Sequence, residues 1–65
     1  MNINLKFIQK AIEDRNYISF LYENKRYKNI KPLELIKKEE YLLKSPSKDF
    51  NFKLITNLII LKEKF

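Results

Sequence analysis

Hydrophobic residues in the first part of the chain recur at helical spacing. Leu5, Ile8, Ala11 and Ile12 fall on one side of a helical wheel, whereas the charged residues between them fall on the other. Because an α-helix turns once every 3.6 residues, this spacing places an apolar stripe along one face. The pattern predicts an amphipathic helix over residues 4–15 that covers one side of a sheet.

The pattern then changes to strict alternation, which is typical of β-strands. Ile18, Phe20 and Tyr22 share one face of the first predicted strand, 17–23. A hairpin turn follows at 23–26, where an asparagine supplies the positive φ that glycine would otherwise take. The sequence contains no glycine, so asparagine is expected at most tight positions.

A proline interrupts the second predicted strand, which runs from residue 27 to about residue 38. Pro32 has no N–H to donate to a strand ladder, so it belongs at an edge, a bulge or a bend. The alternation changes phase there, because Ile30 is an even position whereas Leu33 and Leu35 are odd. We interpret the segment as one strongly curved strand that passes from one side of a barrel to the other.

The second half of the chain predicts three further strands separated by polar turns. The strands are expected at 41–44, 50–54 and 59–63, with a charged turn at 37–40 and a polar loop at 45–49. Phe50 and Phe52 share a face of the fourth strand and are predicted core residues. Residues 55–58 are ambiguous and could form a short helical turn before the last strand.

One helix and five short strands in 65 residues predict a single small domain, 1–65. Closing short strands into a barrel removes their exposed edges. The predicted fold class is therefore mainly β, an SH3-like or Sm-like five-stranded β-barrel over residues 17–63 preceded by an N-terminal amphipathic α-helix over 4–15. A four-stranded open sheet beneath one helix is the alternative.

The composition narrows the chemistry. The chain has no cysteine and no histidine, which excludes disulfides, thiolate chemistry and the common zinc sites. Ser45 and Ser47 have no histidine to activate them, and no glycine loop exists to hold a phosphate. We expect no enzyme activity, no cofactor and no metal. No signal peptide is recognisable and the longest uncharged apolar run, 58–61, is too short for a membrane span, so a cytoplasmic location is expected.

The net charge of +6, from 14 basic and 8 acidic residues, favours negatively charged partners. Only Arg15 and Arg26 are arginines, the residue whose planar fork best matches a phosphate. Most of the lysines therefore also fit an ordinary solvated surface.

A smaller set of basic and aromatic residues forms the candidate binding site. Lys28, Lys44 and Lys53 each occur near the middle of a different predicted strand, so they could converge on one face. Together with Tyr22 and Tyr41 they would form a basic, aromatic-edged groove suited to a nucleotide or to single-stranded nucleic acid. The alternative is three separate solvated lysines, with each tyrosine in the core and its hydroxyl at the rim.

Five segments spread along the chain share their order and spacing with one known family. They are Ala11-Ile12, Ile18-Ser19-Phe20-Leu21-Tyr22, Lys28-Asn29-Ile30-Lys31-Pro32-Leu33, Tyr41-Leu42 and Phe52-Lys53-Leu54. Together they resemble a WYL domain, the SH3-like β-barrel module of bacterial transcriptional regulators. The third segment resembles that family's Arg-x-Val-x-Pro-Leu pattern, the fourth the end of its Trp-Tyr-Leu, and the fifth its Phe-Arg-Leu. Glu40 stands where the family usually has Trp, and Lys28 and Lys53 stand where it usually has Arg.

The resemblance implies a regulatory ligand-sensing module that recognises a negatively charged ligand, a nucleotide or nucleic acid, in transcriptional regulation. The family usually carries a helix-turn-helix DNA-binding domain ahead of this module. That domain is not part of this sequence, so we expect either one domain of a longer regulator or a short relative. The alternative function is a structural module, a possible homo-oligomer that pairs through exposed barrel strands such as 58–61. Direct non-specific single-strand binding is a third possibility.

Overall fold

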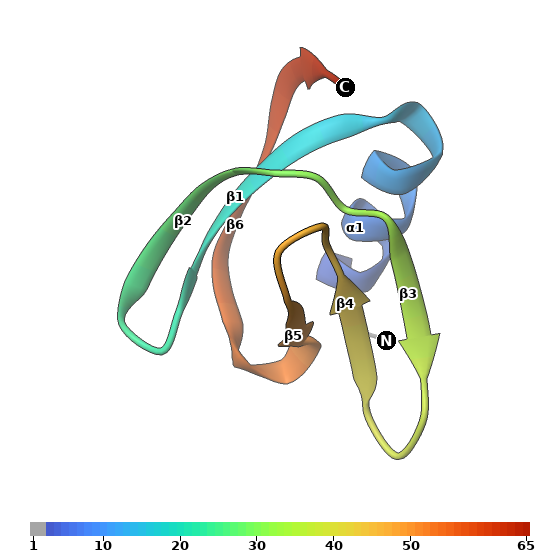
Figure 1. The fold of residues 1–65 in the computed structure, drawn as a ribbon, viewed down its shortest axis with the longest axis vertical. Helices are drawn as coiled ribbons and strands as arrows, with labels where there is room; N and C mark the ends of the chain where they lie inside the picture. Colours follow the sequence, from blue (N-terminus) through green and yellow to red (C-terminus); the bar gives the residue numbers. More distant parts are fainter. Residues whose placement is uncertain (1–2) are drawn as a thin grey trace.

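The computed structural model describes residues 3–65, a helix followed by two small antiparallel sheets (Figure 1). The elements in chain order are α1 (Ile3–Asp14), β1 (Asn16–Tyr22), β2 (Lys25–Ile30), β3 (Glu34–Lys37), β4 (Tyr41–Lys44), β5 (Asp49–Asn51), the 3₁₀ helix η1 (Phe52–Leu54) and β6 (Ile55–Lys64). One sheet has the order β2-β1-β6 and the other β3-β4-β5. The mainly β class with an N-terminal helix is confirmed.

The helix packs its predicted stripe against the sheets. Ile8 and Ala11 are fully buried, and Leu5 and Ile12 pack partly buried against the same core. The helix contacts β1, β6 and β3, and in Figure 1 it lies between β1 and β3. It ends at Arg15, whose φ of 59° is left-handed. The next residue, Asn16, begins β1.

The predicted hairpin joins β1 to β2. Glu23 and Asn24 both have positive φ, 51° and 64°, as the two central residues of a type I′ turn require. The turn places Tyr22 opposite Lys25, and Phe20 opposite Tyr27. This register turns the side chain of Tyr27 toward the core-facing side of the sheet, beside the ring of Phe20.

The single curved strand predicted over 27–38 is wrong. The chain forms β2 in one sheet, leaves it at Ile30, and begins β3 in the other sheet at Glu34. The buried Pro32 lies in the crossing, where its missing N–H costs no ladder hydrogen bond. The next residue, Leu33, donates its N–H to the carbonyl of Lys44 at 2.9 Å and so guides the chain into the second sheet.

The predicted strand at 41–44 is confirmed as β4, but the strand at 50–54 is shorter than predicted. β5 ends at Asn51 because the Oδ1 atom of this residue accepts the N–H of Lys53 at 3.1 Å and starts η1. The helical turn that residues 55–58 could have formed lies earlier, at 52–54, and the last strand begins at residue 55 and not at residue 59. Phe52 remains a core residue, as predicted, although it leaves the strand.

The core lies between the two sheets and α1. Phe20 of β1 and Phe50 of β5 are both fully buried and meet edge to face, with ring centroids 5.0 Å apart. Six strands replace the five that were predicted, and their hydrogen bonds form two separate three-stranded ladders. The ladder of the described residues therefore does not close into a five-stranded barrel, nor is it one open four-stranded sheet. No helix in residues 3–65 has the length and hydrophobicity needed to cross a membrane.

Candidate ligand-binding surface

Four aromatic rings from three strands meet where the two sheets face each other. This aromatic cluster consists of Phe20, Tyr22, Tyr27 and Phe50. The ring of Phe50 lies 5.0 Å, centroid to centroid, from each of the other three, always edge to face. Such edge-to-face contacts are favourable because the positive ring edge meets the negative ring face. The cluster therefore holds its rings in fixed orientations.

Two lysine ammonium groups lie over this cluster. Lys48, in the loop between β4 and β5, places Nζ 5.5 Å from the ring centroid of Tyr22, 5.7 Å from Tyr27 and 5.3 Å from Phe50. The Nζ of Lys25 lies 5.5 Å from the centroid of Tyr27. These distances are within cation–π range. Among the aromatic rings of residues 3–65, that of Tyr27 is the one with two ammonium groups over it.

Solvent reaches only part of the cluster. Phe50 is 0% exposed and Tyr22 is 8% exposed, whereas Tyr27 is half-buried. Both lysines above it are exposed. The ring of Tyr27 is therefore the one in this cluster that an incoming planar group can reach.

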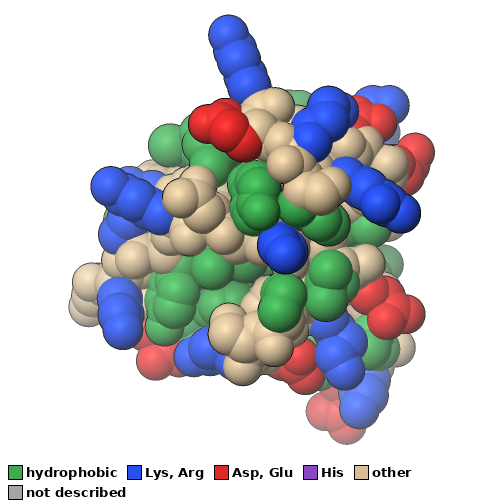
Figure 2. Space-filling view, turned by 45° about the horizontal axis from the view of Figure 1, so that its top comes forward, with side chains coloured by type: hydrophobic (Ala, Val, Ile, Leu, Met, Phe, Trp, Pro, Cys, Tyr) green, Lys and Arg blue, Asp and Glu red, His purple; other side chains and the backbone are tan. Residues whose placement is uncertain are grey.

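The surrounding edge of the molecule is strongly basic. The segment 25–31 and the nearby loop supply five cations, which we call the basic edge: Lys25, Arg26, Lys28, Lys31 and Lys48. No acidic residue occurs between Glu23 and Glu34. The two ion pairs within residues 3–65, Lys10 with Asp14 and Lys53 with Glu40, use none of these five. Figure 2 shows Lys and Arg side chains spread around hydrophobic side chains on one face. The five cations of the basic edge therefore have no acidic partner among the described ion pairs, and Arg26 donates one hydrogen bond to the Ser19 hydroxyl at 3.4 Å.

Tyr22 supports this surface from beneath. Its ring is buried within the aromatic cluster, and its hydroxyl accepts the backbone N–H of Asn51 at 3.0 Å. That hydrogen bond ties β1 to the end of β5, across the two sheets. The residue that sequence reasoning proposed as a ligand contact thus lies at the site, with its ring turned to the core.

Tyr41 packs edge to face on Phe52, with ring centroids 6.4 Å apart, whereas Lys53 lies in a second group centred on Glu40. This carboxylate accepts the Nδ2 of Asn51 at 2.7 Å and pairs with the Nζ of Lys53 at 3.2 Å. The hydrogen bond from the amide, followed by the hydrogen bond and charge of the lysine, lowers the pKa of the Glu40 carboxyl. The Tyr41 ring carries the Nζ of Lys37 4.5 Å from its centroid. The positive charge of Lys53 is therefore already matched by a partner.

Lys28 and Lys44 are placed differently from each other. Lys28 is exposed on β2 and belongs to the basic edge, but strand alternation turns its side chain to the opposite face from Tyr27. Lys44 is half-buried on β4, where its strand neighbours across the ladder are Glu34 and Asp49. No hydrogen bond, ion pair or ring contact in the described residues joins these two lysines to the other three predicted site residues. The described contacts thus link Tyr22 to the aromatic cluster and Lys53 to Glu40, and they bring no two of the five predicted site residues together.

Sequence reasoning missed Tyr27 and Lys48. The tyrosine could have been found from the hairpin register, because a two-residue turn at 23–24 places it opposite Phe20. The lysine lies in a polar loop without periodicity, so no pattern in the sequence marks it.

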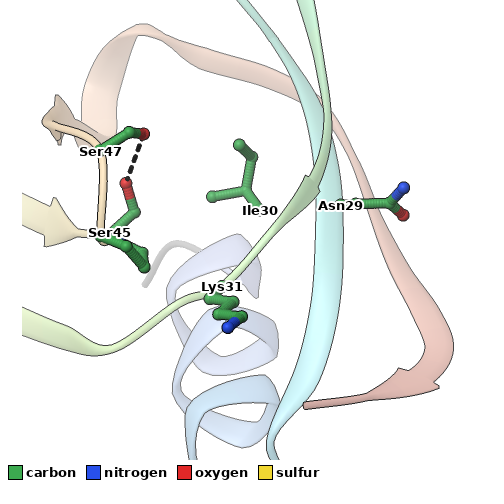
Figure 3. Close-up of a pocket in the computed structure, with 6 residues that line it drawn as sticks. Asn29, Ile30, Lys31, Ser45 and Ser47 are labelled. Carbon is green, nitrogen blue, oxygen red and sulfur yellow. Dashed lines mark hydrogen bonds between the residues drawn. The ribbon is translucent and has the colours of Figure 1, made fainter.

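Two hollows lie beside these surfaces. The first, about 230 Å³, lies between the end of β2 and the loop after β4, and is lined by Asn29, Ile30, Lys31, Ser45, Pro46 and Ser47. In Figure 3 the two serine hydroxyls face each other, 3.5 Å apart, and Ile30 points toward them, whereas Asn29 points away. Ser45 also donates its hydroxyl to the carbonyl of Lys48 at 2.7 Å, which holds the loop that carries this lysine.

The second hollow, about 460 Å³, adjoins the Glu40 group and is lined by Lys38, Glu39, Glu40, Leu42 and Asn51. Its charges are mixed, and it lacks the free positive charge of the basic edge. Within residues 3–65, no three His, Cys, Asp or Glu side chains lie close enough together to hold a metal ion. Comparisons with protein-family models, with curated proteins and with solved structures each found no match.

Proposed function

We propose that this chain is a non-enzymatic binding module that recognises a negatively charged ligand, a nucleotide or single-stranded nucleic acid, in transcriptional regulation. One observation carries the proposal: the partly buried Tyr27 has two ammonium groups over its ring, from Lys25 and Lys48, and neither lysine is in an ion pair within residues 3–65. A base stacks on a ring of this kind while its phosphates contact the lysines.

The physics favours this class of ligand over a neutral one. Each phosphate that a lysine neutralises releases condensed counterions, which drives binding and makes it depend on salt. Stacking of a base on an aromatic ring adds about 1–3 kcal/mol without requiring a particular sequence. Lys28, one of the predicted site residues, extends the charge along the same strand.

The proposal includes the finer fold, an SH3-like barrel of the WYL type. Three features support it. They are the helix that precedes β1, the segment Ile18–Tyr22 within β1, and the passage of the chain between the sheets at Pro32. In this proposal the two three-stranded ladders are the two halves of the barrel. Lys48 connects them over the aromatic cluster, since this lysine follows β4 and Tyr27 lies in β2.

The experiment is a titration of the protein into 5′-fluorescein-labelled octathymidylate at low salt, followed by anisotropy. We expect binding that weakens steeply as salt rises. Tyr27→Leu, which keeps an apolar side chain in the core, should weaken binding at least about fivefold. The matched control is Phe7→Leu, since Phe7 is a 48% exposed ring on α1, away from this surface. Absence of binding at low salt, or an equal effect of the two substitutions, would refute the proposal.

One observation favours a second function, a structural module that pairs with another copy. β6 is ten residues long, pairs with β1 along one side, and has no strand on its other side within residues 3–65. Its Ile59 is 50% exposed and Ile60 is 37% exposed. An unpaired edge of this kind can add a strand from a partner. Sedimentation over a wide concentration range tests this function. A structural module of this kind should form a dimer as the concentration rises, and a constant monomer mass would exclude it.

A further inference from the structure

Strand β2 lies at the outside of its sheet and has a partner on one side. The order β2-β1-β6 places β1 on that side, and no strand of residues 3–65 pairs with the other side (Figure 1). An edge strand presents unpaired N–H and C=O groups, to which an added strand can hydrogen-bond. The open edge of β2 therefore offers backbone groups to an extended chain.

The hairpin register identifies the backbone groups that point away from β1. Because the turn has two residues, Tyr22 and Lys25 close it as a hydrogen-bonded pair. Such pairs alternate with non-hydrogen-bonded pairs along an antiparallel ladder, so the next pair, Leu21 with Arg26, is of the second kind. The N–H and C=O of Arg26 therefore point outward, and Lys28, two residues further on, repeats this orientation. None of the described backbone hydrogen bonds of residues 3–65 outside the ladders uses these groups.

Positive side chains flank this edge on both faces of the sheet. Lys25 shares the core-facing side with Tyr27, and its ammonium group lies 5.5 Å from the centroid of that ring. Arg26 and Lys28 alternate to the other face, where the guanidinium donates to the hydroxyl of Ser19 at 3.4 Å. None of the three cations is in an ion pair within residues 3–65. An added strand therefore meets positive charge on either face.

We propose that the edge of β2 binds an extended acidic segment of a partner protein, which adds to the sheet as a further strand. This inference goes beyond the proposed function, because its partner is a polypeptide recognised through its backbone. Main-chain hydrogen bonds supply affinity, and carboxylates at alternate positions pair with the cations. The positive φ of Asn29, 52°, and the register shift beside it end the regular ladder, so the segment pairs with residues 25–28.

Charge complementarity favours an acidic strand over a second copy of β2. Pairing two β2 edges would bring Lys25, Arg26 and Lys28 of one copy against the same residues of the other. Like charges directly opposite each other destabilise a sheet, and lysines on an edge ordinarily prevent such self-pairing. A strand that carries carboxylates meets no such repulsion. The basic edge therefore selects against its own copy and for an acidic partner.

The first test titrates the protein into a fluorescein-labelled heptapeptide of alternating glutamate and valine, followed by anisotropy. The matched control is the same peptide N-methylated throughout, which keeps every charge but has no N–H to donate to β2. We expect the control to bind at least about tenfold more weakly, because strand addition requires these hydrogen bonds. Equal binding of the two peptides would show attraction by charge alone and would overturn the proposal.

Amide hydrogen exchange locates the bound peptide. We expect the N–H groups of Arg26 and Lys28 to exchange more slowly at saturating peptide, because both point outward in the free protein. Unchanged exchange of both amides would overturn the proposal whether or not octathymidylate binds. Slower exchange without peptide, as the protein concentration rises, would assign the edge to a second copy and would equally overturn it.

A pair of variants separates the backbone group from the charge. Arg26→Pro removes the outward N–H without removing a hydrogen bond to β1, whereas Arg26→Gln removes the same charge and keeps the N–H. We expect Arg26→Pro to weaken peptide binding about fivefold more than Arg26→Gln does. Urea unfolding checks that both variants fold, and the peptide comparison on the wild-type protein does not depend on them. Equal effects in two folded variants would contradict strand addition.

Discussion

The ammonium group of Lys48 lies 5.7 Å from the ring centroid of Tyr27, although the two residues belong to segments of different sheets. The lysine is in the loop after β4 and the tyrosine is on β2, so their contact exists only when both sheets are in place. The candidate site is therefore a product of the tertiary fold and not of any one strand or motif.

Two of the lysines predicted from the sequence should behave differently in a binding experiment. Lys28 belongs to the basic edge, whereas Lys53 pairs with Glu40 at 3.2 Å. We expect Lys28→Gln to weaken octathymidylate binding and to reduce its salt dependence, and Lys53→Gln to change neither. Both substitutions remove one positive charge, so each is the control of the other. Equal losses would mean that net charge alone drives binding.

The hydroxyl of Tyr22 should contribute to stability and not to ligand contact. It accepts the N–H of Asn51 at 3.0 Å, and Tyr22→Phe leaves that donor without its partner. We expect the free energy of unfolding to fall by about 1 kcal/mol. Urea denaturation measures the change. Tyr41→Phe is the control, because no hydrogen bond of its hydroxyl occurs in the described residues, and a similar loss there would contradict the assignment.

The Glu40 carboxylate should make stability depend on acid pH. Hydrogen bonds from Asn51 and Lys53 favour its charged form and lower its pKa in the folded protein. The stabilisation is therefore present above the unfolded pKa of a glutamate, about 4.3. It is lost as pH falls through the lower, folded value.

Glu40→Gln removes this stabilisation, so its destabilising effect should be present at neutral pH and shrink in acid. Urea midpoints measured from about pH 7 to about pH 3 follow the change across the unfolded and folded pKa values. Glu39→Gln changes the net charge by the same amount at an exposed position without a described ion pair. A difference between the two variants that stays constant with pH would contradict the prediction.

A glycine should stabilise the end of α1. Arg15 has a φ of 59°, and the left-handed conformation costs a non-glycine residue about 1–2 kcal/mol. Arg15→Gly removes this cost, but the extra freedom of glycine in the unfolded chain offsets part of the stabilisation. The substitution should therefore stabilise the protein by up to about 1 kcal/mol. Gln9→Gly, at an exposed position inside the helix, should destabilise by about 1 kcal/mol. Thermal or urea unfolding compares them, and a loss of stability in Arg15→Gly would refute the strain argument.

Local periodicity predicted the elements whose contacts are local. The stripe of α1 and the alternation of β1 are both in the sequence, and the hairpin turn follows from Asn24. The strands whose bounds were predicted wrongly depend on hydrogen-bond partners that are distant in the sequence. After Pro32 the chain enters the second sheet because the N–H of Leu33 donates to the carbonyl of Lys44. A single sequence does not reveal that hydrogen bond.

The site was less predictable than the fold. The sequence indicated the right residue types: Tyr22 lies beneath the proposed surface, and Lys28 lies on the strand that carries Tyr27. It could not show that Lys53 is matched by Glu40, because that pair joins the turn before β4 to η1 across a β-hairpin. It also could not show which loop lysine lies over the aromatic cluster, because loop geometry is set by hydrogen bonds such as that of Ser45 to Lys48.

The salt dependence of octathymidylate binding tests the central claim most directly. Lys25→Gln combined with Lys48→Gln removes both ammonium groups over Tyr27, and Lys6→Gln combined with Lys38→Gln removes two exposed charges elsewhere. Each lysine that neutralises a phosphate of a single strand contributes about 0.7 to the slope of log K against log salt. We therefore expect the first double variant to lower that slope by about 1.4 and the second to leave it unchanged. Equal slopes for the two double variants would contradict the claim that Tyr27 and its two lysines form the ligand-binding surface.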